Sequence, residues 1–150
     1  MKKLTYLSLL FIAILFTSCE KTIMKFDSQS VIEFKPIALT VTRGVTSTQA
    51  SSTGTILVQL VGPQQSTPIT VPYTIDATNS TAVAGTNYTL STSGTVTIPA
   101  NSSSAQIVVT GSYANNTASK KLVLILGDGS VKANPNYKTC TVTFSTTVTP

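Results

Sequence analysis

The side chains that enzymes most often use for catalysis are scarce in this sequence of 150 residues. It has no histidine, which removes the commonest general base. Serine and threonine are abundant, but a hydroxyl nucleophile needs an activating partner, and none is evident. The positive charges are dispersed rather than gathered in a stripe, so no nucleic-acid partner is expected. The composition therefore predicts a protein that is not an enzyme and does not bind nucleic acid.

The cysteine at position 19 is the residue whose surroundings indicate a definite chemistry. Lys2 and Lys3 precede an apolar stretch, residues 4–16, that is shorter than the roughly 20 residues of a membrane-spanning helix. A positive start followed by a short apolar run is typical of a secretory signal. The run Phe16-Thr-Ser-Cys19 resembles the lipobox of bacterial lipoproteins, although Phe16 stands where Leu is usual. This resemblance implies that the thiol of Cys19 receives a diacylglycerol and that the signal is cleaved before it.

This interpretation divides the chain into a lipoprotein signal peptide (1–18), a lipidated tether (19–30) and a folded domain (31–150). Two or three acyl chains would hold the protein firmly on a membrane, because each buried CH₂ contributes about 0.8 kcal/mol. Glu20 replaces the Asp that retains some lipoproteins in the inner membrane, which favours an outer-membrane location in the cell envelope. The alternatives are an ordinary signal peptide with a chance cysteine and an uncleaved anchor helix.

The rest of the chain consists of short apolar-alternating runs separated by Gly, Pro, Asn and Ser clusters, a pattern typical of β-strands and turns. It predicts an all-β fold, an Ig-like antiparallel β-sandwich of about seven strands. Pro36 is a point at which the first strand could split, and Pro72 is expected at a sheet edge or a bulge because it lacks an N–H. The predicted strands are 31–42, 54–61, 69–76, 94–98, 105–110, 120–127 and 137–145.

The period-two alternation also predicts which side chains face the core. Cys140 shares a face with Val142 and Phe144. Because Cys19 carries the lipid, Cys140 has no intrachain partner, and we expect a buried thiol that packs as a small hydrophobe. The other predicted inward residues are Ile56, Val58 and Leu60; Ile69, Val71, Tyr73 and Ile75; Ala105, Ile107 and Val109; and Leu122, Leu124 and Leu126.

Part of the predicted domain resembles Calx-beta-type domains. The resemblance is carried by 84–109, with its run Gly94-Thr-Val-Thr-Ile-Pro-Ala100, and by Lys121-Leu-Val-Leu-Ile-Leu126. Such domains are Ig-like sandwiches, and similar ones occur in surface lipoproteins of polysaccharide-using bacteria. The family binds Ca²⁺ through acidic loops at one end, but Asn87 replaces its Asp and the loop 111–119 has no carboxylate. Since Ca²⁺ needs roughly six to eight oxygens, several of them charged, we expect no metal and no cofactor; a degenerate calcium-binding domain is the alternative.

The two carboxylates that follow predicted strands are Asp76 and Asp128. A glycosidase needs two carboxylates about 5–10 Å apart. In an Ig-like sandwich the strands 69–76 and 120–127 are antiparallel neighbours, so their ends lie at opposite poles, about 20 Å apart at roughly 3.3 Å per residue. We therefore expect that this pair cannot cooperate.

The same topology places the loops 43–54, 77–93 and 111–119 at the end of the domain that faces away from the membrane. They are rich in Ser, Thr and Asn, whose hydroxyls and amides suit polar partners. The sequence therefore predicts an interaction module for a glycan or an envelope protein, with a purely structural accessory subunit as the other alternative. Tyr113 could stack on a sugar ring or be a plain surface residue. The candidate binding residues are Tyr113, Asn115, Asn116 and Asn87.

Overall fold

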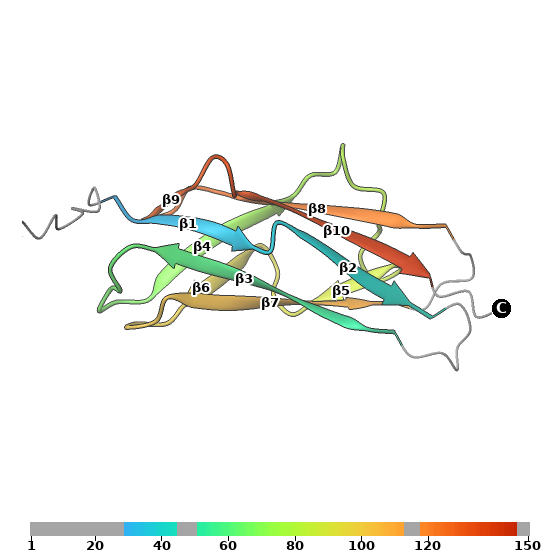
Figure 1. Ribbon diagram of the computed structural model, residues 1–150, viewed down its shortest axis with the longest axis horizontal. Coiled ribbons are helices and arrows are strands. Elements are labelled where there is room, and N and C mark those ends of the chain that lie inside the picture. The colour runs from blue at the N-terminus through green and yellow to red at the C-terminus, as the bar shows by residue number, and fades with distance from the viewer. Residues whose placement is uncertain (1–28, 45–50, 113–117, 147–150) are drawn as a thin grey trace, which may run out of the picture.

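Strands alone form the fold in the parts of the chain that the structure describes. The computed structural model describes residues 29–44, 51–112 and 118–146. No helix in these parts is long and apolar enough to cross a membrane. Ten strands follow one another along the chain (Figure 1): β1 (Val31–Lys35), β2 (Ala38–Arg43), β3 (Thr53–Val61), β4 (Ile69–Ile75), β5 (Tyr88–Leu90), β6 (Thr95–Ile98), β7 (Ser104–Gly111), β8 (Lys120–Leu126), β9 (Lys132–Ala133) and β10 (Thr139–Thr146).

The strands are arranged in two five-stranded sheets, in the orders β5-β7-β3-β1-β9 and β2-β10-β8-β4-β6. Neighbouring strands are antiparallel, except that β1 is parallel to β9 and β2 is parallel to β10. This confirms the predicted all-β sandwich, with ten strands in place of about seven. The prediction missed β5 and β9, which have three and two residues, because such short strands show almost no alternation.

Two prolines lie where strands change partners. Pro36 separates β1, which pairs with β3, from β2, which pairs with β10, so the first predicted strand is indeed split there. Pro72 was expected at a sheet edge or a bulge; β4 as a whole is not an edge strand, because it lies between β8 and β6. The Pro72 carbonyl accepts a hydrogen bond from the Gly127 N–H at 2.9 Å. The Pro72 nitrogen therefore points to the chain just beyond the last residue of β8, Leu126. The missing N–H does not cost a hydrogen bond between strands.

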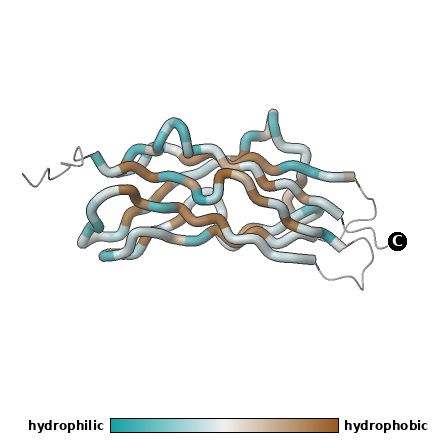
Figure 2. The backbone as a smooth tube through the Cα atoms, viewed as in Figure 1, coloured by the Kyte–Doolittle hydropathy of each residue, from teal (hydrophilic) through white to brown (hydrophobic). Residues whose placement is uncertain are grey.

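The inner faces of both sheets form one core. The predicted inward residues of β3, β7 and β8 are buried, except that Ala105 is only partly buried. Hydrophobic positions recur along the strands of both sheets, and hydrophilic positions gather in the loops (Figure 2). The prediction is wrong for Ile75, which is 42% exposed. Ile75 is the last residue of β4, and it lines a surface pocket together with Leu90 of β5. Its side chain is therefore open to this pocket and is not covered by the facing sheet.

The thiol of Cys140 is buried, as predicted. Its Sγ donates a weak hydrogen bond to the Pro36 carbonyl at 3.2 Å. Burial raises the pKa of the thiol to about 11, so at neutral pH it is protonated. A reactive thiolate needs the opposite shift, and Cys140 is therefore a packing residue.

Candidate functional site

The loops of the elongated sandwich gather at its two ends (Figure 1). At one end β1 begins, the Asn101 N–H donates to the Gln65 carbonyl at 2.7 Å, and Ser30, Gln65 and Ser130 line one pocket. At the other end β2 and β7 finish beside the start of β3. We call the first end the N-terminal pole, defined as residues 29–30, 62–68, 99–103 and 127–131. We call the second the distal pole, defined as residues 44, 51–52, 87, 111–112 and 118.

Serine side chains close the free edge of β2 at the distal pole. The Ser52 Oγ accepts a hydrogen bond from the Thr42 N–H at 2.8 Å, and the Ser52 N–H donates to the Thr42 carbonyl at 2.9 Å. The Ser51 Oγ accepts from the Gly44 N–H at 3.2 Å. The Gly111 N–H donates to the Ser52 carbonyl at 3.1 Å. These bonds join β2, β3 and β7, and they make the distal pole a defined framework.

Asn87 is the one predicted binding residue within the described part of the chain; Cys19, Tyr113, Asn115 and Asn116 lie outside it. Asn87 is at the distal pole, where its carbonyl accepts from the Ser112 N–H at 2.8 Å. Its side chain is buried, and its Oδ1 accepts from the Val83 N–H at 2.8 Å. The oxygen that would meet a ligand is thus already used to hold the loop before β5.

Tyr88 is a core residue that supports the distal pole. Its ring stacks on that of Phe144, with centroids 5.4 Å apart and planes 11° from parallel. Burial raises the pKa of its hydroxyl. The stack joins β5 in one sheet to β10 in the other, and Tyr88 presents no exposed ring for a partner.

Arg43 is a residue next to the distal pole that sequence reasoning overlooked. It ends β2, and its side chain is fully buried. Its Nη2 donates to the Ala118 carbonyl at 2.8 Å, whereas Nε and Nη1 have no hydrogen-bond partner among the described residues. Burial lowers the pKa of the guanidinium. The sequence did contain a sign of this burial. Arg43 follows the inward-facing Val41 by two residues, so both side chains lie on the same face of β2.

Paired hydroxyls lead along the outer face of one sheet towards the distal pole. Thr143 of β10 lies opposite Thr40 of β2, and Ser145 lies opposite Thr42. Their neighbours Val41, Val142 and Phe144 face inward, so these four side chains face outward. We call Thr40, Thr42, Thr143 and Ser145 the hydroxyl ladder. It offers donors and acceptors to a polar partner.

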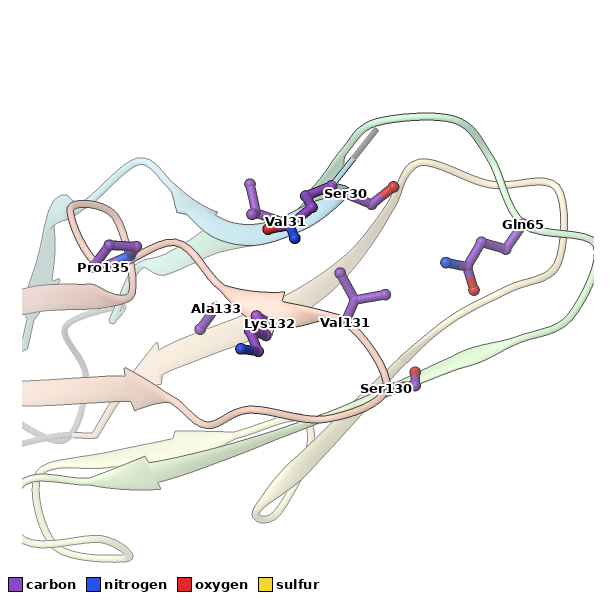
Figure 3. A pocket seen from close by; sticks show the side chains of 9 residues that line it. Ser30, Val31, Gln65, Ser130, Val131, Lys132, Ala133 and Pro135 are labelled. Atoms are coloured by element: carbon purple, nitrogen blue, oxygen red, sulfur yellow. The ribbon is translucent and has the colours of Figure 1, made fainter. Parts of the chain in front are cut away.

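A polar hollow at the N-terminal pole has a volume of about 490 Å³. Ser30, Gln65, Ser130 and Lys132 supply its polar groups, beside Val131. Figure 3 shows the amide of Gln65 directed towards the wall that Ser30 and Val131 form. The described part of the chain begins beside this hollow, at Gln29.

A second pocket of about 490 Å³ lies at the side of the sandwich, between β4 and β5. Ile75 and Leu90 line it, together with the ring of Tyr73. The Tyr73 hydroxyl donates to the Thr92 carbonyl at 2.6 Å, so its polar end is already used. The pocket is mainly an apolar recess and holds no group of catalytic residues.

The carboxylates of Asp76 and Asp128 form hydrogen bonds within their own loops. Asp76 accepts hydrogen bonds from the Asn79 side chain and N–H, which lower the pKa of its carboxyl. Asp128 Oδ1 accepts from the Ala133 N–H at 3.0 Å. β4 and β8 are antiparallel, as predicted, so Asp76 and Asp128 lie at opposite ends of the pair. No cluster of three or more His, Cys, Asp or Glu residues that could hold a metal occurs within ranges 29–44, 51–112 and 118–146.

Comparison with known proteins identifies the fold and not a family. No protein-family model matches the chain, and no curated protein matches it in sequence. Among solved structures, the chain is similar to a Bacteroides ovatus protein with a provisional carbohydrate-binding assignment, at a TM-score of 0.55 and 15% identity. The match covers 79% of this chain and 37% of that one, so this chain spans little more than a third of it.

Two further similar structures match over nearly their whole length. One is the ASH/PapD-like domain of human CEP192, with a TM-score of 0.47, 7% identity and coverage of 89% of this chain and 97% of that domain. The other is WR4, an MSP family member of C. elegans, with a TM-score of 0.43, 8% identity and coverage of 79% and 100%. None of the three descriptions names an enzyme. The chain is an all-β, Ig-like sandwich, and these similarities extend to the fold alone.

Proposed function

We propose that this chain is a lipid-anchored, non-catalytic interaction module of the cell envelope that binds a glycan at its distal pole. The separation of the two poles is the observation that supports the proposal most. The described chain begins at the N-terminal pole, while the hydroxyl ladder leads to the opposite end. A tether of residues 20–30 spans at most about 36 Å. Cys19 as the lipidated residue would therefore keep the domain near an outer membrane, with the distal pole free.

The chemistry of the distal pole favours a glycan over a protein as the partner. Sugar hydroxyls pair well with protein hydroxyls and amides, which both donate and accept. Loops on a rigid sandwich are common binding sites. The carbohydrate-binding assignment of the similar Bacteroides ovatus protein supports the same choice. An envelope protein is the alternative partner, and no observation on the described residues favours calcium.

The proposal is tested by screening the purified full chain on a glycan array and comparing two sets of variants. Thr40→Val with Thr143→Val removes two ladder hydroxyls and keeps their shape, and Tyr113→Ala with Asn115→Ala changes the predicted distal loop. Each set should weaken binding about tenfold, the effect of losing one or two hydrogen bonds, and leave the melting temperature unchanged.

The matched control is Gln64→Ala with Gln65→Ala, at the N-terminal pole. We expect it to leave glycan binding unchanged. The reverse pattern, with binding lost in the control and kept in the distal variants, would contradict the assignment of the distal pole. Absence of any glycan ligand would contradict the proposal itself.

A further inference from the structure

The recess between β4 and β5 opens where β4 continues beyond its neighbour β6. The pairing of β6 with β4 extends only as far as Pro72, and the Tyr73 N–H donates to the Gly94 carbonyl at 2.9 Å. Residues 91–93 then connect Gly94 to β5 in the other sheet. Among the strands that the structure describes, none therefore lies beside Ile75, the last residue of β4, on this side.

The main-chain N–H and C=O groups of Ile75 point to this open side. Successive residues of a strand direct these groups alternately to one neighbouring strand and to the other. The Tyr73 N–H points to the β6 side, where it bonds to Gly94, and the Asp76 N–H points to the β8 side, where it donates to the Val123 carbonyl at 2.9 Å. Ile75 therefore has the direction of Tyr73, and in the described parts of the chain no strand is there to pair with it.

The side chains around this open edge are apolar and partly uncovered. Ile75 is 42% exposed, and it lines the recess of about 490 Å³ together with Leu90 and Tyr73. Gly85 and Gly94 form bare parts of the wall, since a Cβ at either position would meet open space. None of the described residues that line the recess carries a charge. The recess therefore suits an uncharged, apolar group, because such pockets bury mainly apolar surface.

We infer that this recess binds an extended peptide segment of another protein, which pairs its main chain with Ile75 and places an apolar side chain in the recess. A peptide carries an N–H and a C=O beside each side chain, whereas an acyl chain could fill the recess but not bond to the Ile75 N–H. When a peptide adds a strand to a free edge, main-chain hydrogen bonds give affinity and side-chain pockets give specificity. The lining residues share no member with the distal pole, so this inference does not rest on the proposed function.

The test selects peptides on the full wild-type chain from a phage-displayed library of random heptapeptides, and calorimetric titration then measures the affinity of the synthetic peptides. The selected peptides should share one apolar position. Ile75→Lys should weaken their binding at least about tenfold, because a charge replaces part of an apolar wall. Ile37→Lys is the matched control, since Ile37 is 46% exposed and lies outside the recess. It should bind like the wild type, and both variants should keep the wild-type melting temperature.

A second measurement tests the main-chain pairing and needs no variant of the protein. Each selected peptide is synthesised with N-methyl groups on alternate residues, in two versions that block opposite edges of the extended chain. One version should bind at least about tenfold more weakly and the other like the unmodified peptide, because only one edge of the peptide faces Ile75. Equal affinities of the two versions would overturn the inference.

The inference would also be overturned if no peptide were enriched, or if the wild type and Ile75→Lys bound the selected peptides equally. Sedimentation of the wild type and of Ile75→Lys tests a different occupant. Self-association that is lost in the variant would show that a second copy of this chain fills the recess in place of another protein. Ile75→Lys should leave binding on the glycan array unchanged, so failure of this inference leaves the proposed function intact.

Discussion

The two poles of the sandwich differ in how completely their polar groups are satisfied. At the N-terminal pole, loops bond to one another: the Gln64 amide donates to the Ser103 hydroxyl at 3.0 Å, and Asp128 holds the Ala133 N–H at 3.0 Å. The distal pole is closed along β2 by Ser51 and Ser52. Behind this edge, the Nε and Nη1 atoms of Arg43 have no hydrogen-bond partner among the described residues.

The difference indicates which pole awaits a partner. A pole whose donors and acceptors are paired internally gains little from a further polar group, because each new bond only replaces an existing one. A buried donor without an acceptor gains the full cost of its desolvation when an acceptor arrives. In the proposed function, the N-terminal pole joins the tether and the distal pole receives the ligand. Three further experiments can break or sharpen this contrast.

The largest effect is expected from removing the proposed lipid anchor, which would release the N-terminal pole from the membrane. Cys19→Ser should abolish incorporation of a fatty-acid analogue and leave unprocessed precursor, because the lipid has no thiol to join. Labelling followed by gel electrophoresis measures both. Cys140→Ala is the matched control and should keep its label, since that thiol is buried. Normal labelling of Cys19→Ser would remove the basis for calling this pole the membrane side.

A smaller effect is expected when one asparagine is truncated at the distal pole and another in the loop between β9 and β10. Asn87→Ala removes the hydrogen bond that the buried Asn87 side chain accepts from the Val83 N–H at 2.8 Å, which should lower the free energy of unfolding by about 1–1.5 kcal/mol. Asn134→Ala removes an exposed bond, from the Asn136 N–H to Oδ1 at 3.1 Å, and should cost about 0.5–1 kcal/mol. Urea denaturation compares the two. Equal losses would mean that the hydrogen bond of Asn87 is no better protected from water than that of Asn134.

The smallest effect concerns Cys140, which belongs to neither pole and serves as a reference. Burial raises the pKa of its thiol from 9.0 to about 11, so the folded state keeps a proton that the unfolded chain loses between these values. The resulting stabilisation is complete below about pH 9 and is lost as the pH rises towards about 11. The melting temperature of Cys140→Ala should therefore fall less over this range than that of the wild type. Parallel curves would show that the thiol titrates alike in both states.

Local patterns predicted most of the strands and their inward faces. The alternation in β3 and β8 needs only neighbouring residues, and the buried residues follow it. Ile75 broke the pattern because its exposure depends on β5, a three-residue strand of the other sheet. Pro72 was expected at an edge or a bulge because its missing N–H can be read from the sequence. The end of the partner strand β8 at Leu126 cannot be read from it.

The candidate site was less predictable, because it is made of contacts between distant segments. Asn87 was singled out as a replaced ligand, but its side chain turned out to hold the Val83 N–H. Arg43 was counted as one of several dispersed positive charges. Its burial depends on Gly111 and Ala118, about 70 residues further along the chain, and no periodicity in β2 could reveal that they meet it there.

By itself the sequence determined the alternating strands, the absence of histidine and the lack of carboxylates in the segments that follow β2 and β7, since these are properties of residues and their neighbours. The tertiary structure alone decided which polar groups are buried and which of them are paired. The physical reason is that desolvation depends on everything packed around a group. For Arg43 this means the ends of three strands that approach one another only when both sheets have formed.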